Sequence, residues 1–182
     1  MSEKVKKEIF EWIKVFALAI VFAFVITQFI KPTLVRGDSM YSTLEEGDYL
    51  IINRMSYKFG EPKRGDIIVF ESDLQQDDGT NKDLVKRVIG VSGDTIKIKD
   101  SKVYVNGKEL NEPYIHDEIT EGDIDTVVPE NSVFVLGDNR EISLDSRYEQ
   151  VGFINESDIL GKVFVRLYPF NKIGLFWSLI HI

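Results

Sequence analysis

The chain has no cysteine and only two histidines among its 182 residues. The absence of cysteine excludes a disulfide framework, a thiol nucleophile and a thiolate metal site. The scarcity of histidine leaves few of the usual catalytic arrangements open. Long low-complexity tracts are also absent, and a hydrophobic content of 43% is sufficient for a folded core. The composition therefore predicts a folded protein without thiol chemistry.

Basic residues are in the minority and unevenly distributed. The net charge is -8, from 22 Lys and Arg against 30 Asp and Glu. Residues 1–31 hold five lysines and three glutamates, a net charge of +2, which leaves -10 for the remainder. Binding to a nucleic-acid backbone needs clustered basic side chains, so the acidic body argues against a nucleic-acid partner. The acidity itself is explained more simply by solubility.

One long apolar run lies near the N-terminus. The 16 residues between Lys14 and Lys31 read VFALAIVFAFVITQFI and are polar only at Thr27 and Gln28. As a helix they cover roughly 24 Å at ~1.5 Å per residue, and Trp12 and the lysine stems extend this towards the ~30 Å of a hydrocarbon core. The run is therefore long enough to cross a lipid bilayer.

The residues on either side of this run predict whether it is cleaved and how it is oriented in the membrane. Bulky and charged residues follow it instead of a small-residue cleavage site, so we interpret it as an uncleaved signal anchor. Four lysines precede the run, against Lys31 and Arg36 after it, and this excess favours a cytoplasmic N-terminus. We predict a single-pass protein of the cell membrane, with a short cytoplasmic segment (1–14), a transmembrane anchor (15–31) and an extracytoplasmic β-rich domain (32–182).

Beyond the anchor, the pattern is that of β-structure. Asn106-Gly107 is a strong signal for a two-residue hairpin turn. We expect an exposed polar loop over 72–81, a peripheral excursion over 111–130, and either a final core strand or an interfacial segment over 173–182. The short β-branched and aromatic runs predict strands in one barrel-like or multi-sheet domain, at Asp48–Asn53, Asp66–Phe70, Leu84–Val91, Thr95–Lys99, Val103–Val105, Ser132–Leu136 and Lys162–Leu167.

A serine, Ser39, closely follows the anchor in the segment RGDSM at residues 36–40. A nucleophilic serine needs an exposed, sharply held turn, a nearby base and backbone donors that face the developing oxyanion. Taken alone, a serine after Gly-Asp is more often an ordinary turn residue. The rest of the sequence must therefore supply a base.

Lys86 is the candidate base. On a strand over Leu84–Val91 it shares one apolar face with Leu84 and Val88, while Arg87 lies on the other face. Arginine stays protonated in proteins, whereas desolvation lowers the pKa of a lysine. A shift from about 10.4 to neutrality takes about three pKa units, or roughly 4 kcal/mol. The alternative is a lysine that pairs with a carboxylate or extends to solvent.

A third segment, GDNREISLDSR at residues 137–147, follows an apolar strand. Its acidic and basic residues alternate, which favours a scaffold of buried ion pairs and turns. Ser143 and Ser146 are candidates for hydrogen bonds into a neighbouring site. By composition alone, the segment would be a solvated polar loop.

Four segments in order, behind an anchor, resemble the type I signal peptidases, particularly the small single-anchor form of Gram-positive bacteria. The resemblance extends from the anchor to about residue 170 and depends on GDSMYSTL (37–44), RGDIIVF (64–70), KRVIGVSGD (86–94) and GDNREISLDSR (137–147). It implies a mainly β fold and a peptidase that releases exported preproteins from their membrane-bound signal peptides. It implies no metal and no cofactor.

The resemblance also implies roles for individual residues. Ser39 matches the nucleophile and Lys86 the general base of a Ser-Lys dyad. Ser143 matches a serine that hydrogen-bonds and orients this lysine, and Asp145 and Arg147 match a pair that supports the site. Cleavage is expected after small residues at A-x-A-like sites. Met40 is expected to line the substrate cleft.

Two positions depart from the family pattern. Ser42 and Ser92 stand where the family usually has proline, a change that loosens a turn by about 0.4–1 kcal/mol and removes no atom of the dyad. An alternative function is a membrane-anchored paralogue that binds signal peptides without turnover. A self-cleaving Ser-Lys regulator is a third, which the anchor and the lack of a DNA-binding module disfavour.

Overall fold

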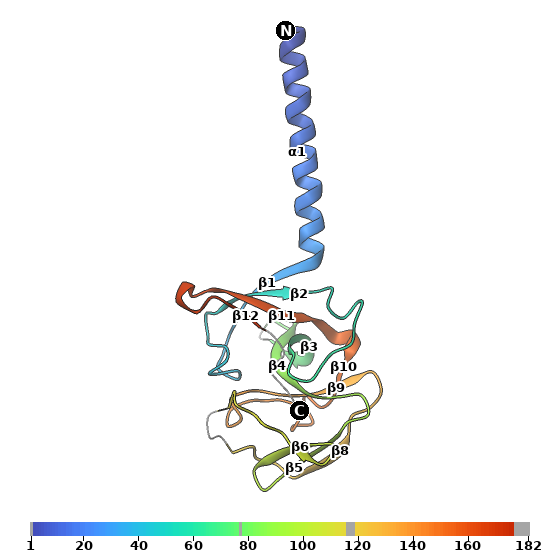
Figure 1. The fold of residues 1–182 in the computed structure, drawn as a ribbon, viewed down its shortest axis with the longest axis vertical. Coiled ribbons are helices and arrows are strands. Elements are labelled where there is room, and N and C mark those ends of the chain that lie inside the picture. The colour runs from blue at the N-terminus through green and yellow to red at the C-terminus, as the bar shows by residue number, and fades with distance from the viewer. Residues whose placement is uncertain (1, 77, 116–118, 177–182) are drawn as a thin grey trace.

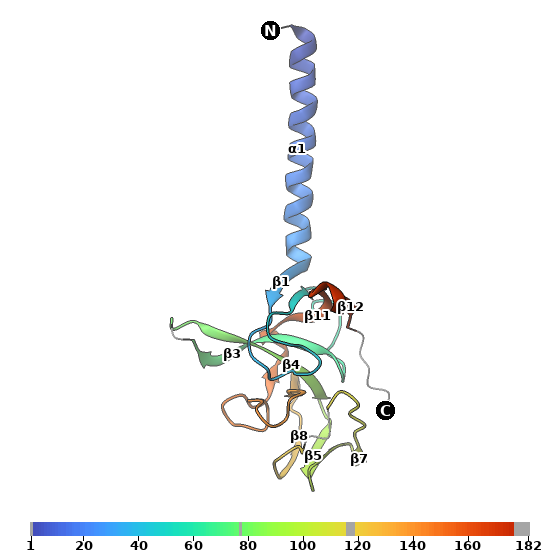
Figure 2. The same ribbon diagram turned by 90° about the vertical axis from the view of Figure 1, so that its left-hand side faces the viewer.

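The computed structural model describes residues 2–76, 78–115 and 119–176. Over these residues the chain is mainly β, with one long N-terminal helix, as the sequence predicts. In Figures 1 and 2 the helix projects from one end of a β-rich body, and the small strands β5 and β8 lie at the opposite end. The helix and the β-rich body are thus distinct parts of the molecule.

The helix α1 spans Glu3–Phe29 and begins at Ser2, whose side chain accepts a hydrogen bond from the Val5 N–H. Its most apolar 18-residue window has a mean hydropathy of 2.4, and no residue of that window is buried. By length and composition, α1 is able to cross a membrane. The helix ends before Ile30 and Lys31, which we expected within the anchor. They pair with the following strand and so belong to the β domain.

The larger sheet has eight antiparallel strands in the order β1-β2-β11-β3-β4-β9-β10, with β12 paired to β11. The 3-10 turns η1 (Glu156–Asp158) and η2 (Phe170–Lys172) precede and follow β11. The strand bounds are β1 Ile30–Leu34, β2 Tyr49–Asn53, β3 Ile67–Gln75, β4 Asn81–Val91, β9 Ser132–Leu136, β10 Ile154–Asn155, β11 Ile159–Tyr168 and β12 Gly174–Leu175.

The smaller sheet has four antiparallel strands in the order β7-β6-β5-β8. The strands are β5 Thr95–Lys99, β6 Lys102–Val105, β7 Lys108–Glu109 and β8 Ile124–Val127. The predicted hairpin turn is confirmed: Asn106 and Gly107 have φ angles of 52° and 78° and connect β6 to β7. Positive φ at both central positions is the geometry that Asn-Gly favours.

The central strands β3 and β4 are buried on both faces. In β3, Ile67 and Val69 pack into one apolar cluster, whereas Ile68 and Phe70 pack into another. β4 is buried from Lys86 to Gly90. This burial confirms the prediction that a strand buried on both sides carries Lys86 and Arg87. A third cluster, which joins the two sheets, includes Ile89, Ile96, Ile98, Phe134 and Leu136.

Two expectations about connecting segments are wrong in part, although residues 76 and 78–80 are exposed and lie outside the strands as expected. Residues 72–75 continue β3 rather than forming an exposed loop, and Ser72 is buried, with its hydroxyl donating to the Lys82 carbonyl at 2.7 Å. Residues 111–130 are not merely peripheral, because β8 pairs with β5 and Val128 packs in the core. β8 has only four residues, which leave little periodic signal. In the C-terminal tail, residues 174–175 form β12, and residues 177–182 lie outside the described residues.

Replacement of an aromatic side chain at the centre of the core should therefore strongly destabilise the folded state. Phe70 is 0% exposed and Phe59 is 86% exposed. We expect Phe70→Ala to lower the free energy of unfolding by about 3–5 kcal/mol, because it leaves a cavity. The matched Phe59→Ala variant should stay within about 0.5 kcal/mol of the original. Urea unfolding of the full chain in detergent measures both, and equal losses would contradict the assigned core.

Candidate active site

Ser39 lies in a tight turn after β1. The Tyr41 N–H donates to the Asp38 carbonyl at 3.0 Å and closes the turn around the serine. Gly37 has a φ of 80°, a conformation that glycine adopts without steric cost. The next side chain, Met40, is buried in the core and fixes the end of the turn. Ser39 is thus held, half-buried, at the edge of the domain.

Lys86 contacts this serine from strand β4. Its Nζ donates a hydrogen bond to the Ser39 Oγ at 2.6 Å. The lysine is only 2% exposed and lies opposite Ile68 of β3 in the sheet register. The fold therefore brings together two residues that are 47 positions apart in the chain.

The surroundings of Lys86 favour the neutral amine. Burial, the largest cause, lowers its pKa from 10.5 to about 8, because the ammonium loses its hydration. Asp145 and Asp138 oppose this change, while Lys82 and Arg147 lower the pKa further. A lysine with this pKa is able to accept a proton from a serine at mildly alkaline pH.

A cleft of about 580 Å³ opens beside the Ser39–Lys86 pair. Three parts of the chain contribute most of its lining: residues 33–39 at the end of β1 and beyond it, residues 81–86 of β4, and the side chains of Ile142 and Leu144. Residues 33–34 and 81–86 are strand, whereas residues 37–39 bend and turn towards the serine. The cleft therefore runs along strand backbone as far as the serine hydroxyl.

The segment 137–147 packs against the serine. The Asn139 N–H donates to the Ser39 carbonyl at 3.1 Å. At Gly137, a Cβ atom would lie 2.5 Å from that carbonyl oxygen and 2.1 Å from the Ser143 Oγ. This close approach requires glycine, and it ties the turn that carries Ser39 to the segment after β9.

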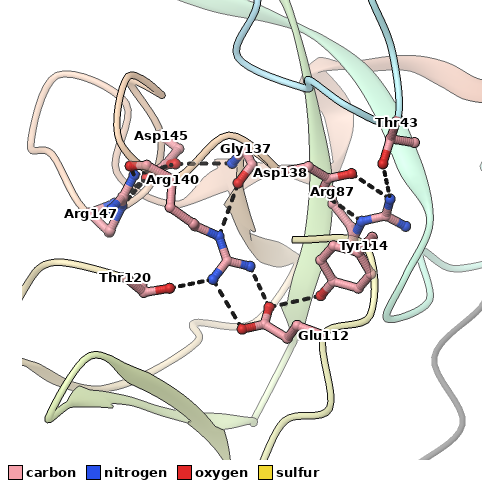
Figure 3. Close-up of polar contacts among 10 residues, drawn as sticks. All are labelled: Thr43, Arg87, Glu112, Tyr114, Thr120, Gly137, Asp138, Arg140, Asp145 and Arg147. Atoms are coloured by element: carbon pink, nitrogen blue, oxygen red, sulfur yellow. Dashed lines mark hydrogen bonds and ion pairs between the residues drawn. The ribbon is translucent and has the colours of Figure 1, made fainter. Parts of the chain in front are cut away.

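The same segment is closed by a buried ion pair (Figure 3). The Arg147 Nε donates to Asp145 Oδ1 at 2.8 Å, and the two side chains are 4% and 0% exposed. Asp145 Oδ2 accepts from the Gly137 N–H at 3.0 Å, and Arg147 Nη2 donates to the Arg140 carbonyl at 2.7 Å. The expected ion-pair and turn scaffold is present.

The chain is similar in sequence to known proteins. The family model for signal peptidase, peptidase S26, matches residues 9–168. The chain belongs to the peptidase S26 family. It is 39% identical to signal peptidase IB of Staphylococcus aureus (strain COL) over 92% of this chain and 93% of the relative. It is also 39% identical to signal peptidase I of Bacillus licheniformis, over 94% and 95% of the two chains.

The solved structures include a similar chain, a signal peptidase I from Enterococcus faecalis V583. It is 33% identical, with a TM-score of 0.47, and the match covers 57% of this chain and 97% of that one. Membership of the S26 family makes the protein a hydrolase of the serine peptidase class. With α1, it points to a membrane-anchored protein.

The structure corrects the placement of Met40. Its side chain is 1% exposed and packs with Val35, Leu44 and Leu50 in the core, and it does not line the cleft. The turn at Ser39 points the next side chain in the opposite direction, into the domain. In this S26 chain, the buried Met40 side chain packs in the core next to the turn.

Ser143 lies near the pair but does not make the expected bond. Its Oγ is buried and makes no hydrogen bond to any residue within the described parts of the chain, Lys86 included. Its backbone N–H donates to the Asn139 carbonyl at 3.1 Å. The hydroxyl lies against Gly137. An orienting role for Ser143 remains a prediction.

Two further buried ion pairs, whose partners the sequence did not predict, are drawn in Figure 3. Arg87 forms a two-pronged ion pair with Asp138, with Nε–Oδ1 and Nη2–Oδ2 distances of 2.8 and 2.6 Å. Arg140 pairs with Glu112, which belongs to the supposed peripheral excursion. Charged residues in otherwise apolar runs were the available signal, but their partners are 51 and 28 positions distant.

The turn at Ser92 is held without the family's proline. The Asp94 carboxylate accepts from the Val91 N–H at 2.9 Å, and the Ser92 hydroxyl donates to the Pro129 carbonyl at 3.2 Å.

Across residues 2–76, 78–115 and 119–176, no group of three or more His, Cys, Asp or Glu is arranged to hold a metal ion.

Gly137→Ala tests the close packing at Ser39. The added Cβ would meet the Ser39 carbonyl and the Ser143 side chain, so the turn must move. We expect a loss of peptidase activity of about 100-fold or more, since a displacement of about 1 Å has that effect. Gly174→Ala is the control, because its nearest neighbouring atom is 3.9 Å away. Full activity in Gly137→Ala would contradict this geometry.

Proposed function

We propose that this chain is a membrane-anchored endopeptidase that removes N-terminal signal peptides from exported preproteins, with Ser39 as nucleophile and Lys86 as general base. The observation that carries the proposal is the 2.6 Å contact between the Ser39 Oγ and a buried lysine with a lowered pKa. Relatives named signal peptidase I and IB support this class of substrate.

In the first half of the reaction, neutral Lys86 accepts the Ser39 hydroxyl proton as Oγ attacks the carbonyl carbon of the scissile bond. The Ser39 backbone N–H is a donor for the developing oxyanion. The resulting Lys86 ammonium then donates its proton to the leaving amine. The C–N bond breaks, an ester forms on Ser39, and the mature protein leaves with a new N-terminus.

In the second half, neutral Lys86 takes a proton from water, and the hydroxide attacks the ester carbonyl. The C–O bond to Ser39 breaks, and the proton returns from Lys86 to the serine oxygen. The signal peptide leaves with a free carboxylate. One amine thus serves as base and acid in both halves, as histidine does in a triad.

We further propose cleavage after small side chains, at A-x-A-like sites. The cleft next to the dyad is lined by Val85, Ile142 and Leu144, which exclude water from small apolar groups. The cleft also runs along strand residues 33–34 and 81–86, whose extended backbone supports a peptide in extended conformation. No metal, cofactor or nucleic acid enters this proposal.

The proposed location is the cell membrane, with the lipid bilayer as a partner of α1. The lysine excess before the apolar run supports a cytoplasmic N-terminus, which places residues 32–182 on the extracytoplasmic side. Preproteins emerge on that side, so the dyad and its substrates would share one compartment.

The function is tested by cleavage of a purified preprotein by the full chain in detergent. Ser39→Ala and Lys86→Ala should each lower kcat by roughly 10⁴-fold or more, because the dyad acts as a unit. The exposed residues Ser157 and Lys99 provide the matched alanine controls, which should retain activity. Binding of the preprotein by wild type without cleavage would support the non-catalytic alternative instead.

The rate should depend on the protonation of Lys86. The pKa of its amine is lowered to about 8, and only the neutral form is a base. The rate should therefore rise with pH through a midpoint near 8, by about tenfold between pH 7 and pH 9. A single-turnover pH series measures this midpoint. A flat profile over this range would contradict Lys86 as the base.

A further inference from the structure

A buried polar cluster behind the dyad includes two side chains from the segment between β7 and β8. Glu112 pairs with Arg140, and their side chains are 7% and 0% exposed. The Tyr114 hydroxyl donates to Glu112 Oε1 at 2.8 Å, and Arg140 also donates to the Thr120 hydroxyl. Figure 3 shows Glu112 between the tyrosine and the arginine.

One arm of this cluster leads to Ser39. The Arg140 Nε donates to the Gly137 carbonyl at 3.0 Å. Two residues later, the Asn139 N–H donates to the Ser39 carbonyl at 3.1 Å, and Gly137 itself packs on that carbonyl. By fixing the Arg140 guanidinium, Glu112 fixes the backbone on which the nucleophile's turn is supported.

The other arm leads to Lys86. The Tyr114 ring lies against the Arg87 guanidinium, 3.9 Å from ring centroid to carbon, in the geometry of a cation–π contact. Arg87 directly follows Lys86 in β4 and also pairs with Asp138. Tyr114 therefore restrains the strand position next to the proposed base, and its hydroxyl bond to Glu112 connects the two arms.

We propose that Glu112 and Tyr114 are positioning residues for the Ser39–Lys86 dyad, which they hold at reacting distance through Arg140 and Arg87. The proposal rests on the proposed function. Neither residue lines the cleft, and neither has a hydrogen bond to Ser39 or Lys86 within the described residues. Their effect is therefore on the reaction step rather than on peptide binding.

The charge of Glu112 is central to this role. A buried guanidinium that loses its carboxylate is left with unsatisfied donors, and the surrounding backbone moves to hydrate them. Gly137 has no space for such a movement without displacing the Ser39 carbonyl. An isosteric Glu112→Gln change removes the charge and keeps the shape.

The test is kcat and KM for preprotein cleavage by the full chain in detergent, with rates divided by the folded fraction from thermal unfolding. Glu112→Gln should lower kcat by about 10- to 100-fold, the effect of a misplaced dyad. KM should change by no more than about threefold, because the cleft is intact. The control is Glu109→Gln, which removes a carboxylate paired with Lys102 at the surface, where both side chains are about half exposed. It should match wild type.

A pair of substitutions at Tyr114 separates the two contacts of this residue. Tyr114→Phe retains the ring on Arg87 and loses the hydroxyl bond to Glu112, whereas Tyr114→Leu loses both. We expect kcat to fall in that order, by a few-fold and then by about tenfold or more. If Glu112→Gln does not fold, this pair decides the proposal.

Wild-type kcat per folded molecule in Glu112→Gln or in Tyr114→Leu would overturn the proposal, and so would a loss confined to KM. In these cases wild type still cleaves, so the proposed function stands. Absence of cleavage by wild type would instead remove the proposed function, and this inference with it.

Discussion

The site depends on one contact, the 2.6 Å hydrogen bond between the Lys86 Nζ and the Ser39 Oγ inside the protein. An amine at this position must be almost completely removed from water, since only burial lowers its pKa enough for it to act as a base. An ammonium group that is removed from water also destabilises the folded state. Strands β3 and β4 supply the two-sided burial that keeps the amine in place, and this explains why a charged residue occupies the centre of the larger sheet.

The charged groups around the dyad follow from the same constraint. Arg87, Arg140 and Arg147 are buried, each with its own carboxylate. Buried ion pairs contribute little net stability compared with apolar side chains of similar volume. They do impose direction, because a guanidinium fork accepts its partner in few orientations. The cluster thus gives the loop after β9 one fixed conformation, which a purely apolar contact would not specify.

Much of this arrangement could be predicted from the sequence, and the limits have physical causes. Runs such as 132–136 and the Asn106-Gly107 turn are local signals, and they correctly predicted strands and a hairpin. The direction of the Met40 side chain depends on a turn geometry that no periodicity records. The partner of Arg140 lies in a segment without a clear periodic pattern. The strands β7 and β8 of the smaller sheet were missed because they have only two and four residues. Long-range pairing, rather than propensity, decides these features.

The position of Ser39 relative to α1 joins the fold to the proposed activity. The helix ends at Phe29, and only ten residues later the chain reaches Ser39, with strand β1 between them. Fully extended, ten residues span at most roughly 33–36 Å. If α1 crosses the bilayer as proposed, the dyad cannot lie farther than this from the end of the helix. A signal peptide whose apolar segment is still in the membrane would reach such a site with a short extended stretch. On this proposal, the short connection limits how far from the membrane the peptide bond is cut.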